Sequence, residues 1–284
     1  MIGSKLNKPD LLQKFFQLLV PALFLASVTG GASQDAGAQV INLASGDKSK
    51  PIEIFADDGI EWQRGNELLI AQGNAKAVRG NVSVSAQVLR AFYQKSPGGG
   101  SDLSRLDAEG GVKIATPTDT LTGRAAVYDL QKAILIVTGK KVRYRMGNDV
   151  ISANQQMEYY ENKLMAVARG GATASHEGKT IRSDILTAYF RKDKAEKSKI
   201  FRVQAFDRVL IVTLQDTVRA DQGIYDIDSG IATLTGNVRI TRGQNQLTGD
   251  QAEINLNTGV SRLLTKPGRK KKKRVSGILS PHRP

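Results

Sequence analysis

Apolar and polar residues alternate along most of this chain with a period of two. In three places the alternation runs through a glycine, within residues 69–77, 106–114 and 232–240. Strict alternation is typical of a β-strand with one buried face and one solvated face. A glycine at the same place within each strand predicts a bend or a bulge there. The pattern therefore predicts long antiparallel strands that are kinked near their middle.

A second segment recurs six times and opens with a branched apolar residue followed by small and polar residues. The copies begin at Val84, Leu121, Ile151, Ile181, Val218 and Leu247, at intervals of 37, 30, 30, 37 and 29 residues. The two long intervals contain the loop 96–101 and the charged stretch 191–199, which are natural hairpin insertions. A period of about 30 residues made of paired strands predicts stacked hairpins, as a solenoid or as a closed sandwich or roll.

Two copies depart from the glycine pattern. After Gly139 the alternation resumes one residue late, and Phe206 stands where a glycine is expected. We interpret the first departure as a local bulge and the second as a loosened bend.

Composition adds constraints on stability and charge. The 284 residues contain no cysteine, which leaves a hydrophobic core as the main source of stability. The net charge is +14, and from Lys266 onward there are eight basic residues and no acidic one. We predict that residues 265–284 form a basic disordered tail, either solvated or attracted to phosphates and anionic lipid headgroups. Nucleic acid is disfavoured because no aromatic residues are interleaved with the basic run.

The N-terminus has the three-part layout of a secretory signal peptide. Three lysines precede an apolar run over residues 15–28, and small residues end at Ala38. The run of 14 residues is shorter than the roughly 20 that span a bilayer. We predict a signal peptide over 1–38, cleaved after Ala38, and a linker over 39–50. An uncleaved anchor is the alternative.

A family resemblance is carried by residues 51–62, by residues 71–75 and by the repeated glycine strands. Over residues 51–264 the chain resembles the LptA/OstA family of lipopolysaccharide transport. The resemblance implies an all-β fold, an OstA-like β-jellyroll of repeated antiparallel strands that is open at both ends. It also implies head-to-tail self-association into a periplasmic bridge, with an anchored inner-membrane component and an outer-membrane translocon as partners. The length and the predicted signal favour the bridge component itself.

The resemblance further implies that the functional surface is the interior face, which holds the acyl chains of lipid A. By alternation, that face corresponds to Ala75, Ala77, Val112, Ile114, Val142, Tyr144, Ala172, Ala174, Val209, Ile211, Val238 and Ile240. Ordinary core packing is the alternative for each of them. The alanines fill little volume, which favours an interior with room for lipid.

The sequence offers no constellation of residues for catalysis. His176 and His282 are far apart, and Asp57 and Asp58 precede Gly59 in a context typical of a turn. Phosphate-binding loops, nucleophile elbows and metal-ligand spacings are absent from the sequence. We therefore predict no enzyme activity, no cofactor and no metal. The leading hypothesis is a carrier that transports lipopolysaccharide between the two membranes. The alternative is an exported structural or adhesive β-repeat protein without a ligand.

Overall fold

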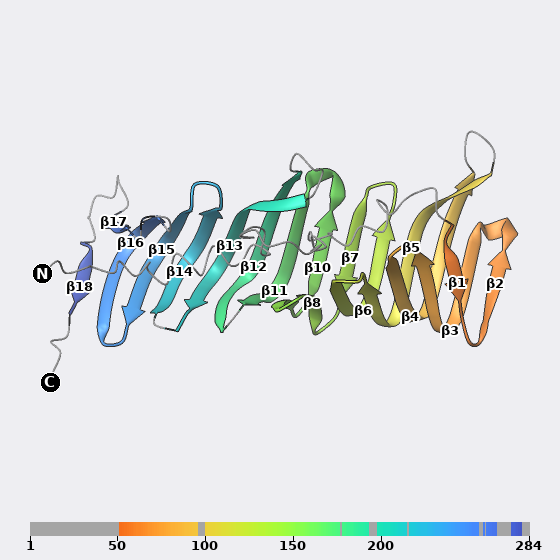
Figure 1. The fold of residues 1–284 in the computed structure, drawn as a ribbon, viewed down its shortest axis with the longest axis horizontal. Coiled ribbons are helices and arrows are strands. Elements are labelled where there is room, and N and C mark those ends of the chain that lie inside the picture. The colour runs from red at the N-terminus through yellow and green to blue at the C-terminus, as the bar shows by residue number, and fades with distance from the viewer. Residues whose placement is uncertain are drawn as a thin grey trace, which may run out of the picture. The chain divides into compact units, whose positions relative to one another are not determined.

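The fold consists almost entirely of β-strands. The computed structural model describes residues 51–95, 100–176, 178–192, 198–214, 216–255, 258, 260–265 and 274–279. The strands are β1 (Glu53–Phe55), β2 (Gly59–Gln63), β3 (Leu68–Arg79), β4 (Val82–Lys95), β5 (Ser101–Ala115), β6 (Asp119–Asp129), β7 (Ile134–Thr138), β8 (Val142–Met146), β9 (Asp149–Ala153), β10 (Gln156–Tyr160), β11 (Met165–His176), β12 (Lys179–Lys192), β13 (Ser198–Val212), β14 (Asp216–Asp226), β15 (Ile231–Arg242), β16 (Asn245–Asn255), β17 (Ser261–Leu264) and β18 (Ser276–Ile278) (Figure 1). Two 3₁₀ turns, η1 (Arg64–Asn66) and η2 (Glu161–Lys163), are the only helical elements in these residues. Within the same residues, none of the helical elements is long and apolar enough to cross a bilayer.

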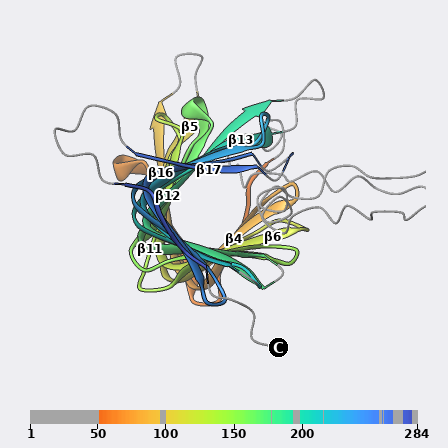
Figure 2. The same cartoon turned by 90° about the vertical axis from the view of Figure 1, so that its left-hand side faces the viewer.

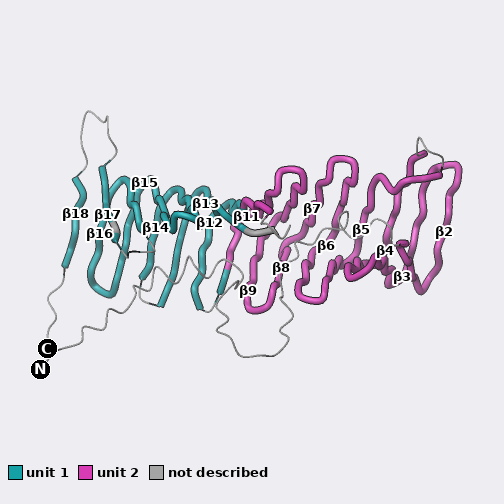
Figure 3. Tube along the Cα trace, turned by 45° about the horizontal axis from the view of Figure 1, so that its top comes forward, with its two compact units in different colours: residues 1–26, 175–188, 200–284 teal, residues 27–174, 189–199 magenta. Residues whose placement is uncertain are grey.

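The chain divides into two compact units (Figure 3). Among the described residues, unit 2 comprises residues 51–174 and 189–199, and unit 1 comprises residues 175–188 and 200–279. Both units are built from antiparallel hairpins, as the alternation predicts.

Unit 2 places its strands in nearly sequential order. Strands β2, β3, β4, β5 and β6 are successive neighbours, and β1 pairs with the half of β3 that β2 leaves open. Strand β6 pairs with β7 along one half and with β8 along the other. Strand β7 then pairs with β10, β8 pairs with β9, and β10 pairs with β11.

Unit 1 has the same antiparallel plan, with long strands of 11 to 15 residues. Strands β12 to β16 are successive neighbours. The outer edge of β16 is shared between two short strands, because β17 pairs with residues 251–254 and β18 pairs with residues 246–248.

The long strands bend near their middle. The register shifts between Gln72 and Ala75 on β3, and between Thr235 and Val238 on β15. Gly73 and Gly236 lie at these shifts with φ of 77° and 78°, which L-residues rarely adopt. A Cβ atom at Gly73 would also collide with the side chain of Asp58. The bends let the strands of each unit curve around an interior, as the end-on view in Figure 2 shows. The predicted all-β jellyroll of antiparallel strands with glycine bends is confirmed.

Of the two departures from the glycine pattern, the bend expected at Phe206 is present, whereas the bulge expected after Gly139 is not. The chain bends in β13 without glycine, at Asp207 and Arg208, whose φ angles are 61° and 51°. The Arg208 guanidinium forms an ion pair with Asp184, which ties this bend to β12. After Gly139 the strand is interrupted between β7 and β8, and does not continue through a bulge.

A duplication of 97 residues underlies the shorter repeat. Strands β2, β3, β4, β5 and β6 and the turn η1 each recur with the same bounds 97 residues later, as β10, β11, β12, β13, β14 and η2. One copy therefore corresponds to about three of the predicted hairpin periods.

The C-terminal tail needs one correction. Residues 276–278 were predicted to be disordered, but they form β18 and pair with β16. Backbone pairing with an open sheet edge does not require the apolar periodicity on which the prediction rested. Residues 266–273, the signal peptide 1–38 and the linker 39–50 lie outside the described residues.

Candidate lipid-binding interior

The residues predicted for the interior face are all buried or partly buried. Ten of the twelve are buried, and Tyr144 and Ile240 are partly buried. Within unit 2, the core cluster brings together Ala75, Ala77, Val112, Ile114 and Val142, with Tyr144 packed against it. Ala172 and Ala174 are buried on β11, and Val209, Ile211 and Val238 are buried in unit 1. Their burial follows from the period of two, which directs alternate side chains to one face. Their role in binding lipid stays a prediction.

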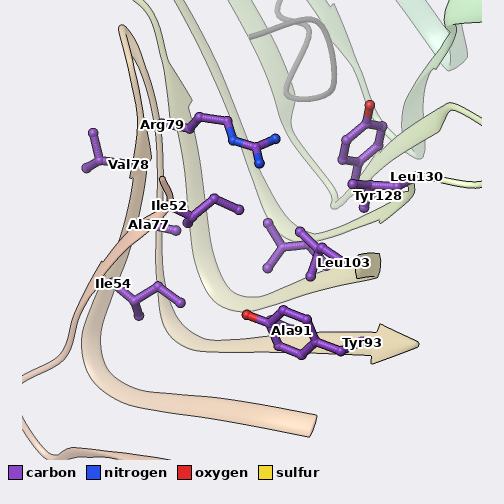
Figure 4. A pocket seen from close by; sticks show the side chains of 11 residues that line it. Ile52, Ile54, Ala77, Val78, Arg79, Ala91, Tyr93, Leu103, Tyr128 and Leu130 are labelled. Atoms are coloured by element: carbon purple, nitrogen blue, oxygen red, sulfur yellow. The ribbon is translucent and has the colours of Figure 1, made fainter. Parts of the chain in front are cut away.

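Unit 2 contains an apolar pocket (Figure 4). The space between its walls is partly open to solvent. The walls come from β1, β3, β4, β5 and β6 and the chain beside them. They are formed by Ile52, Ile54, Ala77, Val78, Arg79, Ala91, Tyr93, Leu103, Leu106, Tyr128 and Leu130.

Three polar groups belong to this wall. The Tyr128 hydroxyl donates a hydrogen bond to a carboxylate oxygen of Glu161 at 2.6 Å, so it is already engaged. Burial raises the pKa of Tyr93, which therefore stays a neutral hydroxyl at physiological pH. Arg79 supplies the positive charge of the wall, and its guanidinium points over the pocket in Figure 4.

Unit 1 contains a second apolar pocket. Its lining includes Val209 and Ile211 from the predicted set. The other lining residues are Ile181, Val203, Ala205, Gly223, Ile224, Tyr225, Ala232 and Leu234. Burial, assisted by the nearby charge of Asp226, raises the pKa of Tyr225 to about 12. The wall of this pocket carries no ionised side chain.

Sequence reasoning missed most of the residues that line the two pockets. Only Ala77, Val209 and Ile211 of the predicted set line either one. The pocket residues Leu106 and Leu234 lie before the glycines in the same alternating segments, so extending the alternation backward would have found them. The tyrosines Tyr128 and Tyr225 end two of the recurring segments, and they occupy equivalent places 97 residues apart.

The chemistry of the interior suits binding of apolar groups. In the described part of the chain, no cluster of three or more His, Cys, Asp and Glu side chains is arranged to hold a metal ion. Apolar walls with a few polar groups at their margin are typical of sites that shelter a hydrocarbon chain.

Comparison with known families agrees with this architecture. A family described as "LptA/(LptD N-terminal domain) LPS transport protein" matches residues 53–163, 150–260 and 217–277. This chain belongs to the LptA/LptD N-terminal domain family of LPS transport proteins. The first two matches are themselves offset by 97 residues, so the family unit coincides with the structural duplication. The resemblance seen in the sequence is thereby confirmed.

Individual relatives are distant from this LptA-family chain. An uncharacterized protein of Rhizobium meliloti (strain 1021) is 27% identical over 155 residues, which cover 52% of this chain and 78% of the relative. Among solved structures, LptH of Pseudomonas aeruginosa is described as the LptA homologous periplasmic component of the lipopolysaccharide transport device. It is 9% identical, with a TM-score of 0.21, and the match covers 83% of this chain and 99% of LptH.

Proposed function

We propose that this protein is a periplasmic carrier that binds lipopolysaccharide by holding the acyl chains of lipid A in its apolar interior. Membership of a family of LPS transport proteins supports the ligand class. The observation that carries the proposal is the pocket of unit 2, whose wall is apolar over β1, β3, β4, β5 and β6.

The physical basis is the transfer of hydrocarbon out of water. Each buried methylene contributes about 0.8 kcal/mol, so one acyl chain gains enough to bind without covalent chemistry. Binding of this kind uses neither a nucleotide nor a catalytic residue, and the proposed role is therefore non-enzymatic. Energy for directed movement would come from a partner in the inner membrane.

The proposal includes location and partners. The signal peptide expected over residues 1–38 supports export to the periplasm. The strand edges at β2 and β18, within the described residues, support head-to-tail association with further copies, and with the inner-membrane and outer-membrane components of a transport bridge.

Leu103 offers a direct test of the site. Its side chain lines the pocket and is only partly buried, so a charge there disturbs the pocket more than the fold. We expect Leu103→Asp to weaken binding of purified lipopolysaccharide by about tenfold or more, because a carboxylate must be desolvated when an acyl chain enters. Binding to the full-length protein is measured by displacement of a fluorescent lipid probe.

The matched control lies on the same strand. Lys113 is exposed on β5 and faces away from the buried Val112 and Ile114, so Lys113→Asp introduces the same side chain outside the pocket. Circular dichroism and thermal unfolding of both variants report on folding. Wild-type affinity in a folded Leu103→Asp protein would contradict the proposal and favour a β-repeat protein with no ligand.

A further inference from the structure

Arg79 is a cationic side chain placed at an otherwise apolar wall. It is the last residue of β3, directly before the hairpin to β4, and its guanidinium reaches over the pocket of unit 2 (Figure 4). Its stem lies beside Ala77 and Ile52, and Tyr128 and Leu130 approach from β6 and the residue after it. An arginine can bury its stem while the guanidinium reaches the margin of an apolar surface.

Among the described residues, the guanidinium has no hydrogen-bond or ion-pair partner of the kind that such a position normally requires. The Nε atom of Arg79 is buried, and no described residue accepts a hydrogen bond from it. None of the ion pairs formed by the described residues includes Arg79. A buried donor without an acceptor costs free energy, which a bound anion would recover.

In unit 1, an arginine at the end of a long strand is held by an ion pair within the protein. Arg242, the last residue of β15, donates two hydrogen bonds of 2.8 Å to the carboxylate of Asp216. That arginine is neutralised within the protein, whereas the charge of Arg79 is left available. The residue 97 positions after Arg79 is His176.

We propose that Arg79 binds the phosphate or carboxylate group of an amphiphile whose alkyl chain occupies the pocket of unit 2. The proposal rests on the proposed function and adds to it a group that recognises the ligand's charge. The guanidinium presents a planar set of donors that matches a phosphate or carboxylate in two-point contact. The apolar wall formed by Ile54, Leu103 and Leu106 lies beside it and accepts the chain.

The test compares two ligands that share a chain and differ in the head. Decyl phosphate and decanol are titrated into the full-length protein by calorimetry, below the concentration at which they form micelles. We expect the wild type to bind decyl phosphate about tenfold or more tightly than decanol, as is typical of a charge-assisted contact. Arg79→Met should remove most of this preference and leave decanol binding nearly unchanged, because methionine keeps an apolar stem.

Two further variants separate the charge from its surroundings. Arg79→Lys retains a positive charge without the planar fork, so it should keep part of the preference. Lys76→Met removes a charge from an exposed position on β3 and should keep all of it. Thermal unfolding identifies any variant that has lost its fold. If Arg79→Met does not fold, the preference for decyl phosphate is compared between the wild type and Arg79→Lys.

If folded Arg79→Met still prefers decyl phosphate to decanol, the anion binds elsewhere and the inference is wrong. If the wild type binds decanol without preferring decyl phosphate, the inference also fails, but the proposed function stands. If the wild type binds neither amphiphile, the proposed function itself fails. Displacement of decyl phosphate by an equal concentration of inorganic phosphate would show a free-phosphate site and contradict the role given to the alkyl chain.

Discussion

At the scale of single residues, two equivalent buried acids have different surroundings. Asp119 begins β6 and Asp216 begins β14, 97 residues later, and both are buried. The Asp216 carboxylate accepts two hydrogen bonds from Arg242, which lies opposite it in the strand register. Opposite Asp119 stands Met146, and neither carboxylate oxygen of Asp119 has a hydrogen-bond partner of good geometry among the described residues.

The difference comes from the interrupted strand. In the first copy the chain breaks after β7, and β8 restarts with its register moved by one residue relative to the second half of β15. Arg145, which lies 97 residues before Arg242, is therefore paired with Thr120 and exposed to solvent. The sequence shows the delayed alternation after Gly139, but it does not show that the shift separates an arginine from a buried acid.

This contrast predicts a pH-dependent cost at Asp119. Burial raises the pKa of Asp119, and the hydroxyls of Thr118 and Tyr144 offset this only in part. Because its pKa is higher in the folded than in the unfolded protein, ionisation of Asp119 should destabilise the fold as pH rises above about 4. Asp119→Asn should remove this loss and raise the free energy of unfolding at pH 7.

Urea unfolding at pH 4 and pH 7 measures this effect, and two substitutions control for it. Asp216→Asn should instead destabilise the protein at pH 7, because it leaves the Arg242 guanidinium without its carboxylate. Met146→Arg should stabilise the wild type by supplying the missing partner, and should not stabilise Asp119→Asn. Equal stability of Asp119→Asn and wild type at both values of pH would count against an ionised, unpaired Asp119.

At the scale of elements, the alternating pattern was sufficient to predict the strands and their bends. Glycines near the middle of β3, β5 and β15 mark three of the register shifts. The bend in β13 was harder to predict because Asp207 and Arg208 adopt positive φ there, a conformation that glycine adopts more easily. The contact of Arg208 with Asp184 depends on tertiary structure, which overrides the local preference.

The 97-residue duplication could have been predicted from the sequence. The intervals of 37, 30 and 30 residues between recurring segments add up to the 97-residue offset, and the next interval is again 37. The period of about 30 residues is more conspicuous in the sequence than the period of 97 residues. The strand β18 left no comparable signal, because three residues paired through their backbone have no periodicity to detect.

Pairing of β18 with β16 has a consequence for association between copies. Together with β17 it covers the backbone groups on the outer edge of the last long strand. Such an edge recruits further strands when it is open. Deletion of residues 275–284 should therefore increase self-association, seen as a higher mass at equal concentration in analytical ultracentrifugation.

The control deletion removes residues 280–284 and leaves β18 in place, so it should behave like the wild type. Residues 266–274 stay in both proteins, which keeps the basic run constant. A loss of self-association on deleting β18 would show that this strand joins copies and does not cover the edge.

At the scale of the whole molecule, the two ends of the chain present different strands. Among the described residues, β2 is in register with β3 alone, and it exposes apolar side chains. Ile60 is 49% exposed and Trp62 is 64% exposed. In the C-terminal part of the described residues, the short strands β17 and β18 pair with the last long strand, β16. Contact between unlike edges is heterologous and adds copies without closing a ring.

We therefore expect the mass of the protein in sedimentation to rise steadily with concentration. A lysine placed on an exposed edge strand opposes pairing with another chain, so Ile60→Lys should shift the distribution toward the monomer. Leu214 provides a matched control because it is exposed in the chain between β13 and β14, so Leu214→Lys adds the same charge outside β2 and β18.

The salt dependence of self-association distinguishes strand pairing at the edge from repulsion between the basic C-terminal segments. Because salt screens like charges, association of the wild type should strengthen as ionic strength rises. Association of Ile60→Lys should stay weaker than that of the wild type even at high salt, because a lysine at a strand edge must also be desolvated when another strand pairs with it. A monomer at every concentration, or a dimer that saturates, would contradict open-ended growth. A deficit of equal size in Leu214→Lys would show that net charge, and not the β2 edge, controls the association.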